Sequence, residues 1–177
     1  MFDVRPEGFR YYEELRRKQG AGFERVERFV RMALESDRFR GLYPEAFERW
    51  SQAEALLWQR DVEAKLTNVG HTLREGIQRF ATALVGHFSP PDVDENLAHD
   101  QARVKSVLAQ KDDAIGETTR KALEAQWATT SNLVQRLEHG AQREGEPLTW
   151  EDARRAVFLV AAAMVEIDRT VDAAAPT

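Results

Sequence analysis

An arginine and a histidine stand one helical turn apart in the stretch LVQRLEHG (133–140). An imidazole can move a proton near neutral pH, and a guanidinium can stabilise the charge that develops on a phosphate. Arg136 and His139 are therefore a candidate catalytic pair that would need no metal ion. The alternative is structural, because a histidine in the last turn before Gly140 can bond to free carbonyls and interact with the helix dipole.

A second set of polar residues lies on two predicted helices, opposite their apolar stripes. A solvated helix face is usually dense in Lys, Glu and Arg, but these faces are mostly small or neutral. Two such faces could close on one groove, and the candidate ligand-binding residues there are His71, Arg74, Glu75 and Asn132, beside the Arg136/His139 pair.

Structural interpretations of the same residues stay open. His71 could be a core histidine satisfied by Glu75 one turn away, and Arg136 could pair with Asn132 or a neighbouring carboxylate. The small residues could instead form a helix-packing or dimer surface, because they allow close approach. These small residues, Ala64, Ala125 and Ala128, predict a homodimer.

Composition narrows the chemistry. The chain has 177 residues, a formal net charge of −5, four histidines and no cysteine. Without cysteine there is no disulfide, thiol nucleophile or thiolate metal site, and the scattered histidines lack a ligand spacing. We therefore expect no metal and no cofactor. A negative net charge does not favour binding of nucleic acid over a broad surface, so any contact with RNA or a nucleotide would be local.

The location of the protein is predicted from hydropathy. No run of about 18 apolar residues occurs, so we expect no membrane span. The first twenty residues are charged throughout and lack the apolar stretch of a signal peptide. These features predict a cytoplasmic protein.

The elements that must position these residues are helical, because apolar residues recur at helical spacing and no segment alternates with period two. The clearest break is SPPDVD (89–94), and Gly70 and Gly76 indicate a kink or a close helix contact. Thr149 is a good N-cap, with Asp152 in a capping-box position. The predicted helices cover about 7–18, 23–35, 44–87, 95–110, 117–139 and 150–171.

This pattern predicts an all-α helical bundle with one long central helix and an N-terminal helical hairpin. Residues 1–42 would form the hairpin packed on the core, residues 43–171 the helical-bundle core, and residues 172–177 a frayed tail.

The C-terminal part of the chain resembles the last two helices of HEPN-type domains, which are common in bacterial toxin–antitoxin and abortive-infection systems. The matching stretches are LVQRLEHG (133–140) and LTWEDARRAVFLVAAAMVEID (148–168). GHTLREGIQRFATALV (70–85) is similar to the central helix of actinobacterial proteins that share this C-terminal pattern. The resemblance implies a helical module of a bacterial defence or stress system that acts as a homodimer or a partner-binding scaffold.

The resemblance also implies an enzymatic alternative. Many HEPN proteins are metal-independent ribonucleases in which the Arg and His motifs of two chains meet and cleave RNA through the 2′-hydroxyl. His139 would then be the general acid/base and Arg136 the phosphate stabiliser. Only Leu137 and Glu138 separate the pair here, which is shorter than the family's spacing. A further alternative is a regulatory domain that binds a nucleotide through Arg74 and Arg136.

Overall fold

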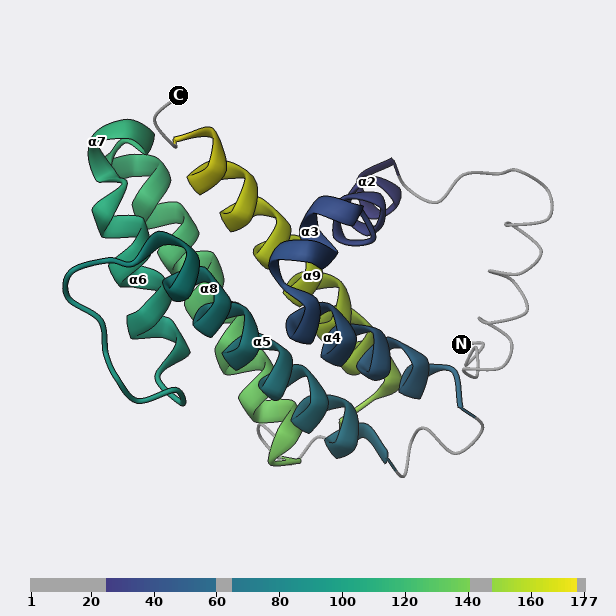
Figure 1. The fold of residues 1–177 in the computed structure, drawn as a ribbon. Coiled ribbons are helices and arrows are strands. Elements are labelled where there is room, and N and C mark those ends of the chain that lie inside the picture. Colours follow the sequence, from purple (N-terminus) through teal and green to yellow (C-terminus); the bar gives the residue numbers. More distant parts are fainter. Residues whose placement is uncertain (1–24, 60–64, 141–147, 175–177) are drawn as a thin grey trace.

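The computed structural model describes residues 25–59, 65–140 and 148–174. In these ranges the chain forms eight helices and no strand, which confirms the predicted all-α bundle (Figure 1). The helices are α2 (Arg25–Leu34), α3 (Asp37–Leu42), α4 (Pro44–Leu57), α5 (Leu66–Phe88), α6 (Asp100–Gln110), α7 (Asp112–Ile115), α8 (Glu117–Glu138) and α9 (Trp150–Ala173).

Helix α5 is the central helix, and it packs against α4, α6, α8 and α9 (Figure 1). Burying a large apolar side chain contributes about 1.5–3 kcal/mol, so a helix that contacts four others is a main source of stability. Its predicted stripe is confirmed, because these side chains are all buried: Leu66, Val69, Leu73, Ile77, Phe80 and Leu84. The inner face predicted for α8 is also buried: Leu123, Trp127, Thr130, Val134 and Leu137.

The prediction of one continuous helix over residues 44–87 is wrong. Helix α4 ends at Leu57, where the backbone N–H of Trp58 turns back to Ala55 and Leu56, and α5 begins at Leu66. The two helices then pack side by side (Figure 1). Their apolar residues read as one stripe because both helices bury that face in the same core.

Other boundaries also differ from the predictions. Helix α3 was not predicted, and it begins where the Ser36 hydroxyl accepts the backbone N–H of Phe39 at 3.2 Å. The turn predicted at KDDAIG contains the one-turn helix α7. Helix α6 begins at Asp100, five residues later than predicted. The helix predicted over 7–18 lies outside the described residues, as do Ala64 and the last three residues of the predicted tail.

The described part of the N-terminal region shares the core of the bundle. Helix α2 packs on α9, and α3 packs on α4. The Tyr43 ring lies 4.7 Å from the Phe80 ring of α5, and Phe39 stacks on the same ring at 6.2 Å. Arg38 pairs with the buried carboxylate of Asp168 on α9, and the Tyr43 hydroxyl donates to it at 3.0 Å. These contacts tie α3 and the start of α4 to α9.

Both predicted helix-end signals near the candidate site are confirmed. The Thr149 hydroxyl accepts the backbone N–H of Asp152 at 3.2 Å, and the Asp152 carboxylate accepts the backbone N–H of Thr149 at 2.9 Å. Gly140 follows α8 with a φ of +60°, a conformation that favours glycine. Within the described ranges, no helix combines the length and the hydropathy that crossing a membrane requires.

Candidate functional site

The candidate residues gather where α5 crosses α8, and the two backbones touch there. A Cβ atom built on Gly70 would lie 2.3 Å from the backbone nitrogen of Glu138 and 2.6 Å from the carbonyl carbon of Leu137. Glycine therefore permits an approach that any other residue would block. The close helix contact predicted at Gly70 is confirmed. We call this line of contact between the two helices the α5–α8 seam. Polar side chains on either side of it come within hydrogen-bonding distance of each other.

A surface cluster lies on this seam and consists of Arg49, His71, Glu75 and Glu138. The Nδ1 atom of His71 is 3.0 Å from a carboxylate oxygen of Glu138, and its Nε2 is 3.8 Å from Glu75. Arg49 of α4 pairs with Glu75 at 3.2 Å. The interpretation of His71 as a core histidine is wrong for this chain, because 63% of its side chain is exposed, whereas Glu75 is half-buried.

A buried cluster lies deeper between α5, α6 and α8, and it consists of Arg74, Asp100, Trp127 and Ser131. The guanidinium of Arg74 donates to Asp100 at 3.0 Å, to the Ser131 hydroxyl at 3.1 Å and to the Ala98 carbonyl at 3.1 Å. The Trp127 indole N–H donates to the second oxygen of Asp100 at 3.1 Å. Every oxygen of this buried carboxylate thus has a donor, as a buried charge requires.

The loop before α6 carries Asp100 into the core. The Asp94 carboxylate accepts the backbone N–H of Asn96 at 2.9 Å and contacts His99 Nδ1 at 2.8 Å. The contact with His99, followed by the bond from Asn96, lowers the pKa of Asp94 below its usual range. Arg103 of α6 donates to the Asp94 carbonyl at 2.7 Å. This loop therefore holds a fixed shape, which delivers Asp100 to Arg74.

Arg74, Asn132 and Arg136 interact with groups other than His71. Asn132 accepts a hydrogen bond from Gln101 of α6 at 3.2 Å, so it bridges α8 to α6. The charge of Arg136 helps to lower the pKa of Asp152 at the start of α9. His139 is exposed at the end of α8, where its backbone N–H bonds to the Gln135 carbonyl at 3.1 Å. The structure thus brings His71 and Glu75 together and directs Arg74, Asn132 and Arg136 to other partners.

Arg136 is part of the electrostatic environment of the α9 N-terminus. Partial burial of Asp152 opposes its ionisation, but hydrogen bonds from the backbone and side chain of Thr149 favour the charged form. The charges of Arg155 and Arg136 add to this, and the pKa of Asp152 is lowered overall. The charge of Arg136 is the smallest of these contributions, and it agrees with the structural interpretation that Arg136 lies near a carboxylate.

Proton transfer is the chemistry that these side chains can supply. An imidazole held by a carboxylate, as His71 is by Glu138, can exchange a proton with a substrate. The exposed His139 could do the same, with Arg136 near it in the chain. No group of three or more His, Asp or Glu side chains with the geometry of a metal site occurs among the residues that the structure describes.

A groove runs along the outer surface between α6 and α8, with a volume of about 380 Å³. Three alanines form part of its lining, and so do the charged residues Lys105, Lys121 and Glu124. Ala125 and Ala128, whose size predicted a packing surface, both line it, together with Ala102 of α6. The buried core residues Val104 and Trp127 form part of its lining, so the groove opens between α6 and α8 beside the core.

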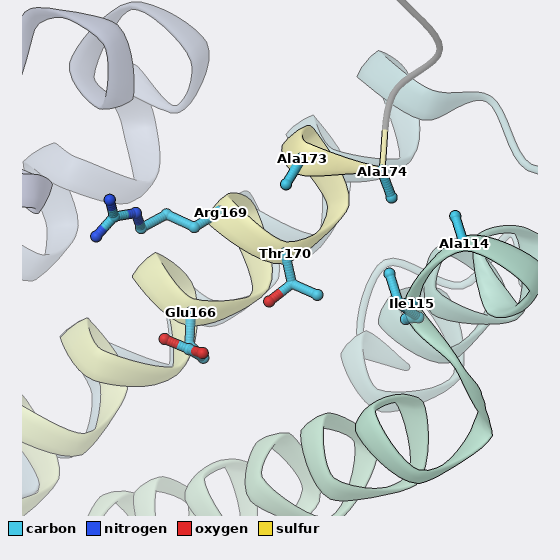
Figure 2. A pocket seen from close by; sticks show the side chains of 7 residues that line it. All are labelled: Ala114, Ile115, Glu166, Arg169, Thr170, Ala173 and Ala174. Carbon is cyan, nitrogen blue, oxygen red and sulfur yellow. The ribbon is translucent and has the colours of Figure 1, made fainter.

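A second hollow, of about 460 Å³, lies between α7 and the last turns of α9 (Figure 2). Ala114 and Ile115 face it from α7, and Thr170 points toward them from α9 (Figure 2). Arg169 points away toward α2, where its guanidinium lies 4.7 Å from the centre of the Phe29 ring (Figure 2). The polar groups of this hollow do not converge on one point, and we assign it no chemistry.

The sequence analysis missed the residues that complete both clusters. Glu138 lies inside the LVQRLEHG stretch and next to the Gly70 contact, so its position was a signal for a His71 partner. Asp100 and Ser131 gave no such signal, because their burial depends on how the loop before α6 folds. Arg49 comes from α4, which the sequence placed in the same helix as His71.

Comparisons with protein-family models, with curated proteins and with solved structures find no match for this chain. The resemblance to HEPN-type domains therefore stays a prediction.

Proposed function

We propose that this protein is a HEPN-like helical module of a bacterial defence or stress system that acts as a homodimeric scaffold. The observation that carries the proposal is the groove between α6 and α8, with Ala102, Ala125 and Ala128 in its lining. Small side chains allow a second helix to approach closely, as ridges pack into grooves. In the proposed dimer the α6–α8 faces of two copies pack against each other.

The outer face of α8 supports this proposal because it is poor in charge. Of its eight exposed residues between positions 118 and 135, Lys121 alone is charged, although 31% of the chain is charged. Depletion of charge is a feature of interface centres. The eight residues are Thr118, Thr119, Lys121, Ala122, Ala125, Thr129, Asn132 and Gln135.

The size of the face also suits a dimer. Helix α8 has 22 residues, so it is about 33 Å long. Helix α6 has 11 residues and is about half as long, so the two helices, each about 10 Å wide, give a flat footprint of roughly 500 Å². The accessible area of such a ridged surface is larger than its footprint, which places it at the lower end of the size range of specific interfaces.

Sedimentation velocity over a range of concentrations tests the proposal. We expect a dimer at tens of micromolar and a monomer for Ala125→Arg, because the new side chain would fill the groove. Ala125 is exposed, so this variant should keep its circular dichroism spectrum. The matched control is Ala55→Arg, at an exposed position of α4, and it should remain dimeric. A monomeric wild type, or a dimer in which Ala125→Arg has no effect, would contradict the proposal.

RNA cleavage is a second candidate function, favoured by one observation. Glu138 holds His71 on the α5–α8 seam, and the exposed His139 directly follows Glu138 in the chain. The imidazole of His71, held by this carboxylate, is suited to acid–base catalysis of an attack by the 2′-hydroxyl. The nucleotide-binding alternative has less support, because the guanidinium of Arg74 already bonds to three groups of the fold.

An assay with single-stranded RNA in EDTA tests this second function. Cleavage should leave a 2′,3′-cyclic phosphate or its opened product, and His139→Ala should abolish it with little change in melting temperature. Arg136→Ala should reduce turnover if its charge acts on the transition state. If the wild type cuts no RNA and His139→Ala mainly lowers the melting temperature, then His139 has a structural role at the end of α8.

A further inference from the structure

Glu138 is held against α5 by a contact between the two backbones. Gly70 directly precedes His71, and a Cβ atom on Gly70 would lie 2.3 Å from the backbone nitrogen of Glu138. The missing side chain at Gly70 therefore brings the end of α8 against the start of α5. From this position a carboxylate oxygen of Glu138 lies 3.0 Å from Nδ1 of His71. The fold thus fixes the carboxylate beside this edge of the imidazole.

This contact determines which nitrogen of a neutral His71 carries the hydrogen. A carboxylate accepts hydrogen bonds and donates none, so Nδ1 must carry the hydrogen that Glu138 accepts. The lone pair of the neutral ring then lies on Nε2. Because 63% of the His71 side chain is exposed, the ring is open to a substrate.

A second carboxylate lies near Nε2 but is held back from it. Glu75, one turn along α5, is 3.8 Å from Nε2 of His71, which is beyond hydrogen-bonding distance. The other oxygen of Glu75 pairs with Nε of Arg49 on α4 at 3.2 Å. If Glu75 bonded to Nε2, the imidazole would be fixed between two carboxylates and would have no free lone pair. The pair with Arg49 therefore keeps Nε2 available.

Arg49 is itself fixed on α4. Its guanidinium donates to the side-chain oxygen of Gln52 at 3.0 Å. Gly76 directly follows Glu75 in α5, and a Cβ atom on Gly76 would lie 3.3 Å from the Cβ atom of Arg49. The two helices are therefore close at this point, which places the guanidinium beside Glu75.

We propose that Nε2 of His71 is the proton acceptor of this site and that Glu138 and Arg49 are its positioning residues. As the O–H bond of a substrate hydroxyl breaks, an N–H bond forms at Nε2 and the electron pair stays on the oxygen. The carboxylate of Glu138 then stabilises the imidazolium through the hydrogen bond at Nδ1. The identity of the substrate, a ribose 2′-hydroxyl, rests on the proposed RNA cleavage, whereas the roles of the three residues do not.

Nitrogen NMR of the full-length protein tests the role of Glu138. Near pH 9 an ordinary histidine is neutral, and ¹⁵N–¹H correlation spectra then distinguish the nitrogen that carries hydrogen from the bare one. We expect hydrogen on Nδ1 of His71 in the wild type and mainly on Nε2 in Glu138→Ala, which is the form that free histidine prefers. A His71→Gln variant assigns the signals. The matched control is Glu124→Ala, because the side chain of Glu124 on α8 is 21% exposed and that of Glu138 is 22% exposed.

Chemical modification tests the role of Arg49. Diethyl pyrocarbonate acylates a bare imidazole nitrogen, and peptide mapping by mass spectrometry resolves the four histidines. His71 should react at least about threefold more slowly in Arg49→Gln, because the released Glu75 can bond to Nε2. The matched control is Arg79→Gln, which removes another ion pair between α4 and α5, that of Arg79 with Glu45 at 3.1 Å. This control should leave the rate at His71 unchanged.

Either measurement can overturn the proposal. Hydrogen on Nε2 in the wild type, or the same tautomer in Glu138→Ala, would show that Glu138 does not orient the ring. An unchanged rate in Arg49→Gln, or an equal decrease in Arg79→Gln, would show that Arg49 does not keep Nε2 free. Neither readout needs cleavage, so the expected tautomer and rates in a protein that cuts no RNA would count against RNA as the substrate alone. The circular dichroism spectrum of each variant verifies that it is folded.

Discussion

A single turn of α5 supplies two polar clusters of opposite character. His71 and Glu75 point outward into the surface cluster, where their side chains are 63% and 38% exposed. Arg74 points inward into the buried cluster, where Asp100 is 2% exposed. Both clusters link α5 to α8, and both contain an arginine paired with a carboxylate about 3 Å away, Arg49 with Glu75 and Arg74 with Asp100.

The difference between them is the cost of losing a partner. A charge at the surface regains water when its partner is removed, so exposed ion pairs typically contribute less than about 1 kcal/mol. A buried charge has no such replacement, and breaking a buried pair typically costs about 3–5 kcal/mol. The buried pair of Arg74 and Asp100 therefore stabilises the fold. The exposed pair of His71 and Glu138 contributes little to stability, so its side chains are accessible to a ligand.

The largest effect should follow from Asp100→Ala. We expect a loss of about 3–5 kcal/mol in the free energy of unfolding, because Arg74 and the Trp127 indole N–H lose their acceptor in the core. Urea denaturation followed by circular dichroism measures this loss. Asp92→Ala, in the exposed loop before α6, should change stability by less than about 0.5 kcal/mol. Similar losses for both variants would show that burial does not separate the two clusters.

The sequence contained most of the information on the fold and less on the clusters. Apolar spacing predicted the buried faces of α5 and α8, because helical periodicity is a local property. Thr149 and Gly140 were found as helix ends for the same reason, since a cap depends on a few adjacent residues. The end of α4 at Leu57 was missed because both helices bury their apolar faces in one core.

Pairing between distant residues could not be read from local patterns. Asp100 is 26 residues from Arg74, and Asp168 is 130 residues from Arg38. An aspartate in a predicted helix is normally exposed, so its sequence position gives no sign that it is buried. His71 and Glu75 were expected to be at least partly buried, and their side chains are 63% and 38% exposed, but the contact of His71 with Glu138 was not predicted. The sequence therefore indicated that α5 and α8 lie together, but most contacts of the candidate residues were not predicted.

Substitution of three glycines of α5 tests how closely this helix packs on its neighbours at the α5–α8 crossing and away from it. Gly70→Ala should cost about 1–3 kcal/mol, because the new methyl group would overlap the α8 backbone and push both clusters apart. Gly76→Ala should have an intermediate effect, since its Cβ would lie 3.3 Å from the Cβ of Arg49. Gly86→Ala should stabilise the protein by about 0.5–1 kcal/mol, because it meets no atom within 4 Å. Urea denaturation of all three should reproduce this order, and a neutral Gly70→Ala would contradict the close contact.

Replacing Tyr43 tests whether the buried carboxylate of Asp168, like that of Asp100, loses stability when a donor is removed. Tyr43→Phe should cost about 1.5 kcal/mol, because Asp168 loses a charge-assisted hydrogen bond but keeps Arg38. Burial, followed by the charge of Asp168 and its hydrogen bond, raises the pKa of Tyr43. An unfolded tyrosine ionises near pH 10, so the folded chain holds this proton more tightly. Stability from Tyr43 is therefore complete below about pH 10 and falls by about 1.4 kcal/mol per unit above it.

Urea denaturation between pH 8 and pH 11 measures that dependence. The wild type should lose stability above pH 10 more steeply than Tyr43→Phe, and the two curves should converge as the pH rises. Parallel curves would show that the Tyr43 hydroxyl does not titrate differently in the folded and unfolded chains.

The smallest effect should be found in the surface cluster. A double-mutant cycle with His71→Ala and Glu138→Ala should give a coupling energy below about 1 kcal/mol, which decreases at high salt because exposed pairs are screened. The matching cycle with Arg74→Ala and Asp100→Ala should give a larger coupling that depends less on salt, because Arg74 is 18% exposed and Asp100 is buried. Equal couplings in the two cycles would remove the contrast between the clusters. A weak coupling at His71 has a functional consequence, because replacing this imidazole would then change activity without unfolding the protein. Any loss of RNA cleavage in His71→Ala could therefore be assigned to chemistry and not to the fold.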